Sequence, residues 1–282
     1  MTMVQRLFLT LLPTLLLAQN QVPDWVSVES NISYSTHKET VLDILQSKRA
    51  ASSAKRVGVI VIHGGGWGAG KKENVFDRLC LPFLEKGFVV ANVEYRLTAT
   101  APAPAAVEDV LAAADWFRSN AAKYGVDRSK IIVTGDSAGG HLALMVGLVP
   151  KQAKFGPTGK VAAVINFYGI TDIQDQLEGE HMRDYAVKWV PASLPDRQEL
   201  ARRLSPVTWA RKDLPPVITI HGDADPIVPY EHGVDLTKEI RNAGSDAEMV
   251  AIHQGGHGNF TSEQFAEIYV QIFSFLAKRK II

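Results

Sequence analysis

Short, β-branched runs that alternate with helical patterns constrain the fold of this chain more than any other feature. Five such runs are almost continuously apolar, and they lie at residues 57–62, 88–95, 131–135, 161–169 and 217–222. Runs of this kind are typical of strands that are buried on both faces of a parallel sheet. Apolar stripes at helical spacing occupy residues 105–124, 138–149, 230–243 and 261–279. We therefore predict an α/β fold, in which a mostly parallel central sheet carries helices on both faces.

The other segments indicate additions to a single domain. Residues 25–46 alternate loosely between apolar and polar side chains and are predicted to form two antiparallel strands that open the sheet. Residues 172–203 mix charges, a tryptophan and two prolines without a strand period, which indicates a small lid inserted above the sheet. Because no repeat or linker divides the sequence, we expect residues 19–282 to form one domain.

Residues 1–18, MTMVQRLFLTLLPTLLLA, have the layout of a secretory signal peptide, with Arg6 before an apolar run and Ala18 before polar residues. Pro13 interrupts the apolar run, which is shorter than the roughly 20 residues that a membrane-spanning helix needs. We therefore expect a secreted or periplasmic protein without a stable membrane anchor. The exact cleavage site stays open, because Leu16 is larger than the residue usually found three positions before the cut.

Charge and cysteine content exclude several classes of function. Lys and Arg together number 30, as do Asp and Glu, so no net field attracts nucleic acid, and no nucleic-acid partner is expected. Cys80 is the one cysteine in the sequence, which rules out an intrachain disulfide and a CxxC motif. His253 and His257 have the spacing of a helical metal pair, but the glycines between them disfavour a helix. We therefore expect no metal and no cofactor.

The motif GDSAG at residues 135–139 fits the pattern G-x-S-x-G. It follows a predicted strand and precedes a predicted helix, which is the context that this motif requires. The sharp turn strains the backbone of its central residue, and glycines two positions away on either side remove side chains that would collide there. Ser137 is therefore the candidate nucleophile, exposed at the carboxyl edge of the sheet, and it needs a base to accept its proton.

A second glycine-rich loop, HGGGW at residues 63–67, directly follows the first predicted parallel strand. It has neither the GxGxxG spacing nor the lysine of a phosphate-binding loop. We predict that the backbone amides of Gly65 and Gly66, joined by that of Ala138, form an oxyanion hole. His63 is expected to brace this loop through hydrogen bonds rather than to act as a base.

The candidate acid follows the predicted strand at residues 217–222, and the candidate base follows a strand-like run, AEMVAI, at residues 247–252. The segment HGDADPIVP at residues 221–229 begins where a strand ends, so its carboxylates lie at the same edge as Ser137. Asp225 is the predicted triad acid and Asp223 its rival, because Asp and Pro also form turns without any function. His257, in a glycine-rich loop, is the predicted general base. The chain order serine, aspartate, histidine matches that of the α/β-hydrolase triad.

Other polar and aromatic residues have structural and functional readings side by side. We expect His141 and His221 to satisfy buried backbone groups, and Arg96 to pair with Asp109. Aromatic side chains that could form a substrate-stacking wall are Trp67, Tyr168 and Trp189, although such side chains are more often part of a core.

These motifs resemble those of α/β-hydrolases in the hormone-sensitive-lipase-like esterase group, and are most similar to bacterial secreted acetyl and feruloyl esterases that act on carbohydrates. The resemblance spans about residues 55–280 and is carried by HGGGW (63–67), EYRL (94–97), the run 104–120, GDSAGGHLAL (135–144), SP (205–206), HGDADPIVP (221–229) and GGHG (255–258). It implies an α/β-hydrolase fold and the same triad and oxyanion donors. The long N-terminal helical cap of typical members is missing from residues 19–55, so enclosure of the pocket depends on residues 172–203.

The sequence therefore predicts a secreted serine carboxylesterase that acts without a cofactor on a small-molecule or oligosaccharide ester. The expected substrates are short-chain acyl or hydroxycinnamoyl esters, acetyl or feruloyl, of plant polysaccharides such as acetylated xylan. A peptidase or amide hydrolase of the same fold, similar to acyl-peptidases or arylformamidases, is one alternative. A hydrolase-fold binding protein without catalysis is the other.

Overall fold

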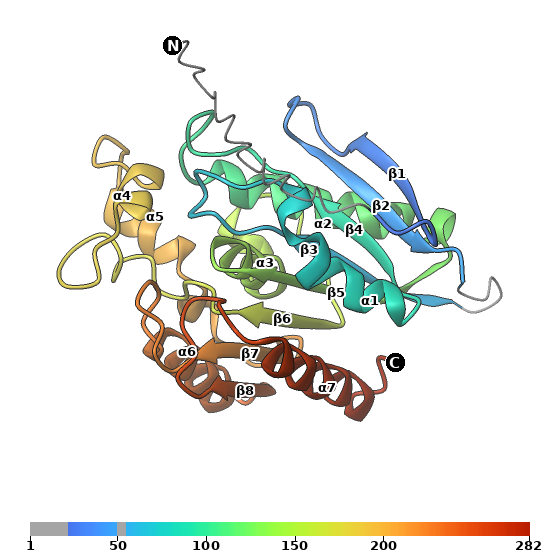
Figure 1. Cartoon of the computed structure of the whole chain (residues 1–282). Helices are drawn as coiled ribbons and strands as arrows, with labels where there is room; N and C mark the ends of the chain where they lie inside the picture. The colour runs from blue at the N-terminus through green and yellow to red at the C-terminus, as the bar shows by residue number, and fades with distance from the viewer. Residues whose placement is uncertain (1–21, 50–54) are drawn as a thin grey trace, which may run out of the picture.

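A single sheet of eight strands organises the computed structural model, which describes residues 22–49 and 55–282 (Figure 1). The predicted signal peptide, residues 1–18, lies outside the described residues. The strands are β1 (Val26–Ser33), β2 (Val41–Ser47), β3 (Arg56–Ile62), β4 (Val89–Val93), β5 (Val126–Asp136), β6 (Ala163–Phe167), β7 (Val217–Gly222) and β8 (Ala247–Ile252).

The strand order is β1-β2-β4-β3-β5-β6-β7-β8. Strand β2 runs antiparallel to both of its neighbours, β1 and β4, whereas all pairs from β4 to β8 are parallel. The prediction of two antiparallel strands before a parallel sheet is therefore confirmed. All five residues of β4 and of β6 are buried, as their mostly apolar sequences indicate, and the one polar residue of each strand is an asparagine.

Helices cover both faces of this sheet (Figure 1). They are α1 (Leu81–Glu85), α2 (Ala105–Asn120), α3 (Ala138–Leu148), α4 (Asp184–Trp189), α5 (Arg197–Leu204), α6 (Glu231–Asn242) and α7 (Ser262–Lys278). Side chains of α1 and α7 share one hydrophobic cluster with Val59 and Val61 of β3. Side chains of α2, α3 and α6 share the other cluster with Ile60 and Ile62. Alternate residues of one strand thus face opposite cores, because successive side chains of a strand point to opposite faces.

Two groups of short elements had no helical prediction. Between β3 and β4, a 3₁₀ turn η1 (Lys72–Val75) and a π-helical turn η2 (Phe76–Cys80) lead into α1. The short 3₁₀ turns η4 (Lys151–Ala153) and η5 (Pro206–Trp209) also lie outside the predicted helices, whereas η3 (Ala121–Tyr124) is the last part of the helical segment predicted at residues 105–124. The predicted insertion, residues 172–203, contains α4 and most of α5, which lie together at one end of the sheet (Figure 1).

The inserted segment is held to the loop after β7 by polar contacts. Arg183 donates from Nε to the carbonyl of Ile227 and from Nη2 to that of Pro226, each over 3.0 Å. Asp175 bonds the imidazole of His232 on α6 over 3.0 Å. Among residues 22–49 and 55–282, no helix is long and apolar enough to cross a membrane.

Candidate active site

Ser137 sits at a strained turn between β5 and α3. Its φ of 54° and ψ of −121° lie in a region that L-residues rarely adopt. A Cβ atom on Gly135 would lie 2.3 Å from the carbonyl oxygen of Gly139, and one on Gly139 would lie 2.2 Å from that of Ile62. The turn therefore requires glycine at both positions, as the motif predicts, and it leaves Ser137 half-buried at the carboxyl edge of the sheet.

His257 connects Ser137 to Asp225. Its Nε2 lies 2.8 Å from Ser137 Oγ, and its Nδ1 lies 2.7 Å from Asp225 Oδ2. The three residues are thus brought together from the loops after β5, β7 and β8. In this arrangement Nδ1 donates to the carboxylate, which leaves Nε2 as the acceptor for the serine proton.

The carboxylate of Asp225 is fully buried and accepts hydrogen bonds at both oxygens. Its Oδ1 accepts from the backbone N–H groups of Ile227 and Val228 over 2.8 and 3.0 Å. His221 Nε2 lies 3.4 Å from Oδ2, on the side shared with His257. Burial alone would raise the pKa of Asp225, but hydrogen bonds from His221 and His257 outweigh it and hold this pKa well below the ordinary value of 3.8. Asp225 is therefore ionised at neutral pH.

The rival carboxylate, Asp223, lies outside this arrangement. It accepts from His253 Nδ1 over 2.9 Å and from the backbone N–H of Gln254, and it does so at the protein surface. Asp223 therefore fixes a turn, and the geometry selects Asp225 as the partner of His257. In the described part of the chain, no group of three or more His, Cys, Asp or Glu side chains could hold a metal ion.

The glycine loop after β3 lies beside Ser137. Gly65 and Gly66 have φ values of 114° and 56°, and a Cβ atom on Gly65 would lie 2.1 Å from the carbonyl oxygen of Ala69. The amide of Gly64 is occupied, because it donates to Asp136 Oδ1 over 2.8 Å. Within residues 22–49 and 55–282, the amides of Gly65, Gly66 and Ala138 have no acceptor. They are therefore available to an oxyanion.

An open pocket of about 370 Å³ surrounds the serine. Its lining consists of Gly65, Gly66, Arg78, Asp136, Ser137, Tyr168, Tyr185, Ile227 and His257. Tyr168 packs edge-on against His257, with ring centroids 4.8 Å apart. Tyr168 therefore lies in the wall of the pocket, and its contact with a substrate stays a prediction.

Trp67 and Trp189, however, do not line the pocket, and their predicted role in substrate stacking is wrong. Both side chains are fully buried and stack on each other with centroids 4.1 Å apart and an interplanar angle of 9°. Trp67 Nε1 donates to His141 Nδ1 over 3.2 Å. The two indoles therefore form part of the core beneath the glycine loop, because burying their large apolar surfaces away from water stabilises the fold.

The predicted structural residues make the contacts expected of them. His63 bonds the carbonyl of Gly64 and the carboxylate of Glu94, which braces the glycine loop. His141 bonds the carbonyl of Leu204 over 2.8 Å, and its burial lowers its pKa to about 4. His221 likewise bonds the carbonyl of Val228 over 3.1 Å.

Arg96 and Asp109 form the expected ion pair, with an Nη2–Oδ1 distance of 2.7 Å. The pair ties the loop after β4 to α2, and both partners are largely buried. It lies outside the serine pocket, so its role is structural.

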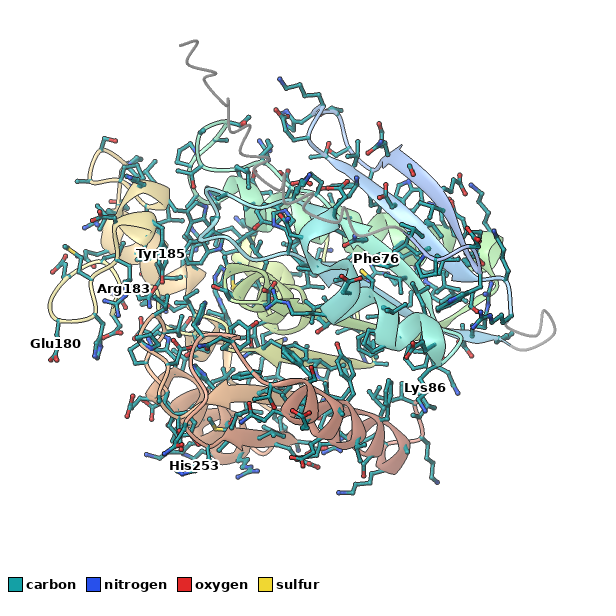
Figure 2. All side chains as sticks on the ribbon, viewed as in Figure 1. Phe76, Lys86, Glu180, Arg183, Tyr185 and His253 are labelled. Atoms are coloured by element: carbon teal, nitrogen blue, oxygen red, sulfur yellow. The ribbon has the colours of Figure 1, made fainter. Side chains whose placement is uncertain are left out.

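Four pocket residues lie outside the predicted site, namely Arg78, Asp136, Tyr185 and Ile227. Tyr185 comes from α4 of the insertion (Figure 2) and packs on the glycine loop, where a Cβ atom on Gly66 would lie 2.8 Å from its ring. Burial raises the pKa of Tyr185 to about 12, so its hydroxyl is neutral. Arg78 belongs to η2, a turn with no recognisable motif.

A protein-family model described as BD-FAE matches residues 42–240 of the chain. The chain is 28% identical over 237 residues to esterase LipC of Mycobacterium tuberculosis, a match that covers 80% of this chain and 59% of LipC. It spans between 55% and 61% of the length of three curated mycobacterial relatives that it matches.

Solved structures share the architecture. A truncated carbohydrate esterase from gut microbiota has a TM-score of 0.78 and 28% identity, and the match covers 90% of this chain and 96% of that one. An esterase of the planctomycete Thermogutta terrifontis, solved with butyrate bound, has a TM-score of 0.75 and 25% identity, covering 92% and 96%.

Proposed function

This chain belongs to the BD-FAE family and has the α/β-hydrolase fold, and on that premise we propose that it is a serine carboxylesterase. The observation that carries the proposal is the hydrogen-bonded line from Ser137 Oγ through His257 to the ionised carboxylate of Asp225. A serine hydroxyl is a weak nucleophile unless a base accepts its proton. The contact of 2.8 Å between Nε2 and Oγ places such a base within reach of the hydroxyl.

In the proposed reaction, Ser137 Oγ attacks the ester carbonyl while His257 Nε2 takes its proton. The buried carboxylate of Asp225 stabilises the imidazolium that forms and keeps Nδ1 protonated. The negative charge that develops on the carbonyl oxygen is stabilised by the amides of Gly65, Gly66 and Ala138. His257 then protonates the leaving alcohol, and an acyl-enzyme on Ser137 remains.

Hydrolysis of the acyl-enzyme repeats these steps with water in place of the alcohol. His257 takes a proton from the water as its oxygen attacks the acyl carbonyl, and it returns a proton to Ser137 Oγ as the acid leaves. General acid–base action of this kind contributes roughly 100- to 10,000-fold, and each oxyanion donor about 100- to 1,000-fold. The site holds groups for both contributions.

We propose esters of carbohydrates with short acyl or hydroxycinnamoyl groups as the substrates, acetyl and feruloyl esters first among them. Similarity to a carbohydrate esterase from gut microbiota supports this substrate class. An open pocket, with Tyr168 and Tyr185 on its walls, also suits a bulky sugar alcohol. We propose that residues 1–18 direct the protein to a secreted or periplasmic location, where such esters occur, and that residues 172–203 act as a lid.

Initial rates on a panel of substrates test this proposal. The panel contains 4-nitrophenyl acetate, butyrate and decanoate, methyl ferulate, acetylated xylan and an aminoacyl 4-nitroanilide, with the Ser137→Ala variant as the control. We expect turnover of acetyl or feruloyl esters that is abolished in the variant. Cleavage of the anilide alone indicates a peptidase instead, and a folded protein that is silent on every substrate indicates a binding protein.

A further inference from the structure

Arg78 places a positive charge in the pocket of the candidate nucleophile. It lies on η2, between β3 and α1, and lines the same cavity as Ser137 and His257. Its side chain is 41% exposed, whereas that of Asp136, behind it, is 10% exposed. The guanidinium therefore faces the open space of the pocket, and the carboxylate of Asp136 lies on its inner side.

The contacts of Arg78 hold it beside the two catalytic loops. Its Nη2 lies 3.2 Å from Oδ2 of Asp136, the residue before the serine, and its Nη1 lies 3.4 Å from the carbonyl of Gly258, the residue after the histidine. The carbonyl of Arg78 itself accepts a hydrogen bond from the hydroxyl of Tyr269 on α7. The backbone under the guanidinium is thus fixed. A single π-helical turn such as η2 is frequently found at functional sites.

These contacts leave hydrogen-bonding capacity unused. A guanidinium has five N–H donors in a planar fork, and the two contacts to Asp136 and Gly258 are both long for charged hydrogen bonds. Asp136 is also shared with the amide of Gly64, so its charge is spread over two donors. Among the lining residues Arg78 is the one Lys or Arg and Asp136 the one carboxylate, and the Arg78 side chain is the more exposed of the two, so Arg78 is the charge that a ligand in the pocket can reach.

We propose that Arg78 is a specificity-determining residue that binds a carboxylate on the alcohol part of the ester. This inference rests on the proposed esterase function and names a substrate class for it, namely esters whose alcohol carries an acidic group, such as acylated acidic sugars. The alcohol side follows from the position of Arg78 next to Gly258. His257, which precedes Gly258, donates the proton to the leaving alcohol, so the alcohol passes the loop that Arg78 contacts.

The test compares matched substrates that differ in the charge of the leaving alcohol. We would measure kcat/KM of the full chain for 4-acetoxybenzoate and for the neutral 4-acetoxybenzamide, each normalised to its rate of hydroxide-catalysed hydrolysis. The variants are Arg78→Gln, which removes the charge, and Arg78→Lys, which keeps it without the planar fork. Lys86→Gln is the control, because it removes an equal charge at a residue outside the pocket lining (Figure 2).

We expect Arg78→Gln to lower the preference for the anionic ester by about 5- to 50-fold, as loss of a partly exposed charged hydrogen bond implies. In Arg78→Gln, kcat/KM for the neutral ester 4-acetoxybenzamide should stay within about threefold of the wild-type value. Arg78→Lys should keep part of the preference for the anionic ester. Added NaCl should reduce the preference of the wild type and not that of Arg78→Gln, since only the former depends on charge. The Lys86→Gln protein should behave as the wild type.

Several outcomes would overturn the inference. An equal loss on both esters in Arg78→Gln would mean that Arg78 only positions the loops of Asp136 and Gly258. A preference that depends on Arg78 for 4-nitrophenyl hemisuccinate over 4-nitrophenyl butyrate, without one for 4-acetoxybenzoate, would place the anion on the acyl side instead. A wild type that hydrolyses the neutral esters without preferring the anionic one would refute the inference and leave the esterase function intact. A wild type that hydrolyses no ester would overturn the proposed function itself.

Discussion

Replacement of Asp225 by asparagine should abolish most of the activity because of the way four donors converge on this carboxylate. Backbone N–H groups of Ile227 and Val228 point at Oδ1, whereas His257 and His221 point at Oδ2. An asparagine side chain offers one oxygen, which accepts hydrogen bonds, and one NH₂ group, which donates them. One of the two pairs of donors must therefore face the NH₂ group. Turning the NH₂ toward the backbone leaves two buried N–H groups unpaired, at about 1–3 kcal/mol each. The NH₂ is therefore expected to face His257.

An NH₂ group at this position favours the other neutral tautomer of the His257 imidazole. His257 Nδ1 must then accept a hydrogen bond, so the proton of the neutral ring moves to Nε2, the atom that lies 2.8 Å from Ser137 Oγ. A protonated Nε2 cannot take the serine proton. In serine hydrolase triads this change lowers kcat about 10⁴-fold, which corresponds to about 5.4 kcal/mol of transition-state stabilisation.

The assay is the steady-state kcat of Asp225→Asn on 4-nitrophenyl acetate at pH 7, with thermal unfolding as the check on folding. Asp223→Asn is the matched control, because Asp223 bonds His253 and the amide of Gln254 at the surface instead. We expect the control to stay within about threefold of the wild type. A folded Asp225→Asn protein that keeps more than a tenth of the wild-type kcat, or a control that loses as much, would refute the reasoning.

Further predictions concern the glycine loop, the core and the acid limb of stability. At Gly66 the backbone φ is 56° and a Cβ atom would lie 2.8 Å from the ring of Tyr185, so Gly66→Ala should displace the loop and lower kcat by about 10- to 100-fold. In Gly68→Ala the nearest atom to the new Cβ would be 3.7 Å away, so this variant should keep the wild-type kcat. Equal kcat values for the two variants would contradict this. Trp189→Ala should lower the free energy of unfolding in urea by about 3–5 kcal/mol, and a loss below 1 kcal/mol would show that its stack is not core. Because the folded pKa of Asp225 is depressed, its stabilisation is complete above its unfolded pKa and is lost as the pH falls from about 4 toward the folded pKa. Urea unfolding should show this as a slope of about 1.4 kcal/mol per pH unit that Asp225→Asn lacks, and parallel slopes would contradict it.

The parallel sheet and its main helices follow from sequence pattern because their burial is nearly uniform. Strand β6 is buried throughout, and four of its five residues are apolar. Helices of one or two turns leave a weaker signal. In α5 (Arg197–Leu204), only Ala201 and Leu204 are buried, and α1 has five residues in all. Such segments do not complete an apolar stripe, and tertiary contacts decide their conformation.

The candidate triad could be predicted because each of its three residues lies in a short motif that directly follows a strand. A strand, a sharp turn with two glycines and a helix set the place of Ser137, and the ends of β7 and β8 deliver Asp225 and His257 to the same edge. Residues that reach the pocket from elsewhere carry no such signal. Arg78 meets Asp136 across 58 positions of the chain, and only the fold shows that contact.

Arg78 was missed by the sequence analysis, whereas Trp67 and Trp189 were wrongly included in the site, because their residue type suggests a binding surface. The sequence looks the same whether a tryptophan lies in a core or on a pocket wall, and only the burial of its side chain in the folded protein distinguishes the two. Trp67 is the last residue of the glycine loop, yet its side chain packs on Trp189 and His141 and does not line the pocket of Ser137. Its φ of 56° accompanies that turn of the backbone. Such a reversal depends on the neighbours in space and is not encoded in spacing.

The most direct test of the account is covalent labelling of the nucleophile. The wild type and the variants Ser137→Ala and His257→Gln would be treated with a fluorophosphonate, which reacts with activated serines, and mapped by peptide mass spectrometry. The account predicts one adduct per molecule on Ser137, none in Ser137→Ala, and labelling slowed by at least about 100-fold in His257→Gln. An adduct on another residue, or ester hydrolysis that persists undiminished in a folded Ser137→Ala protein, would contradict it.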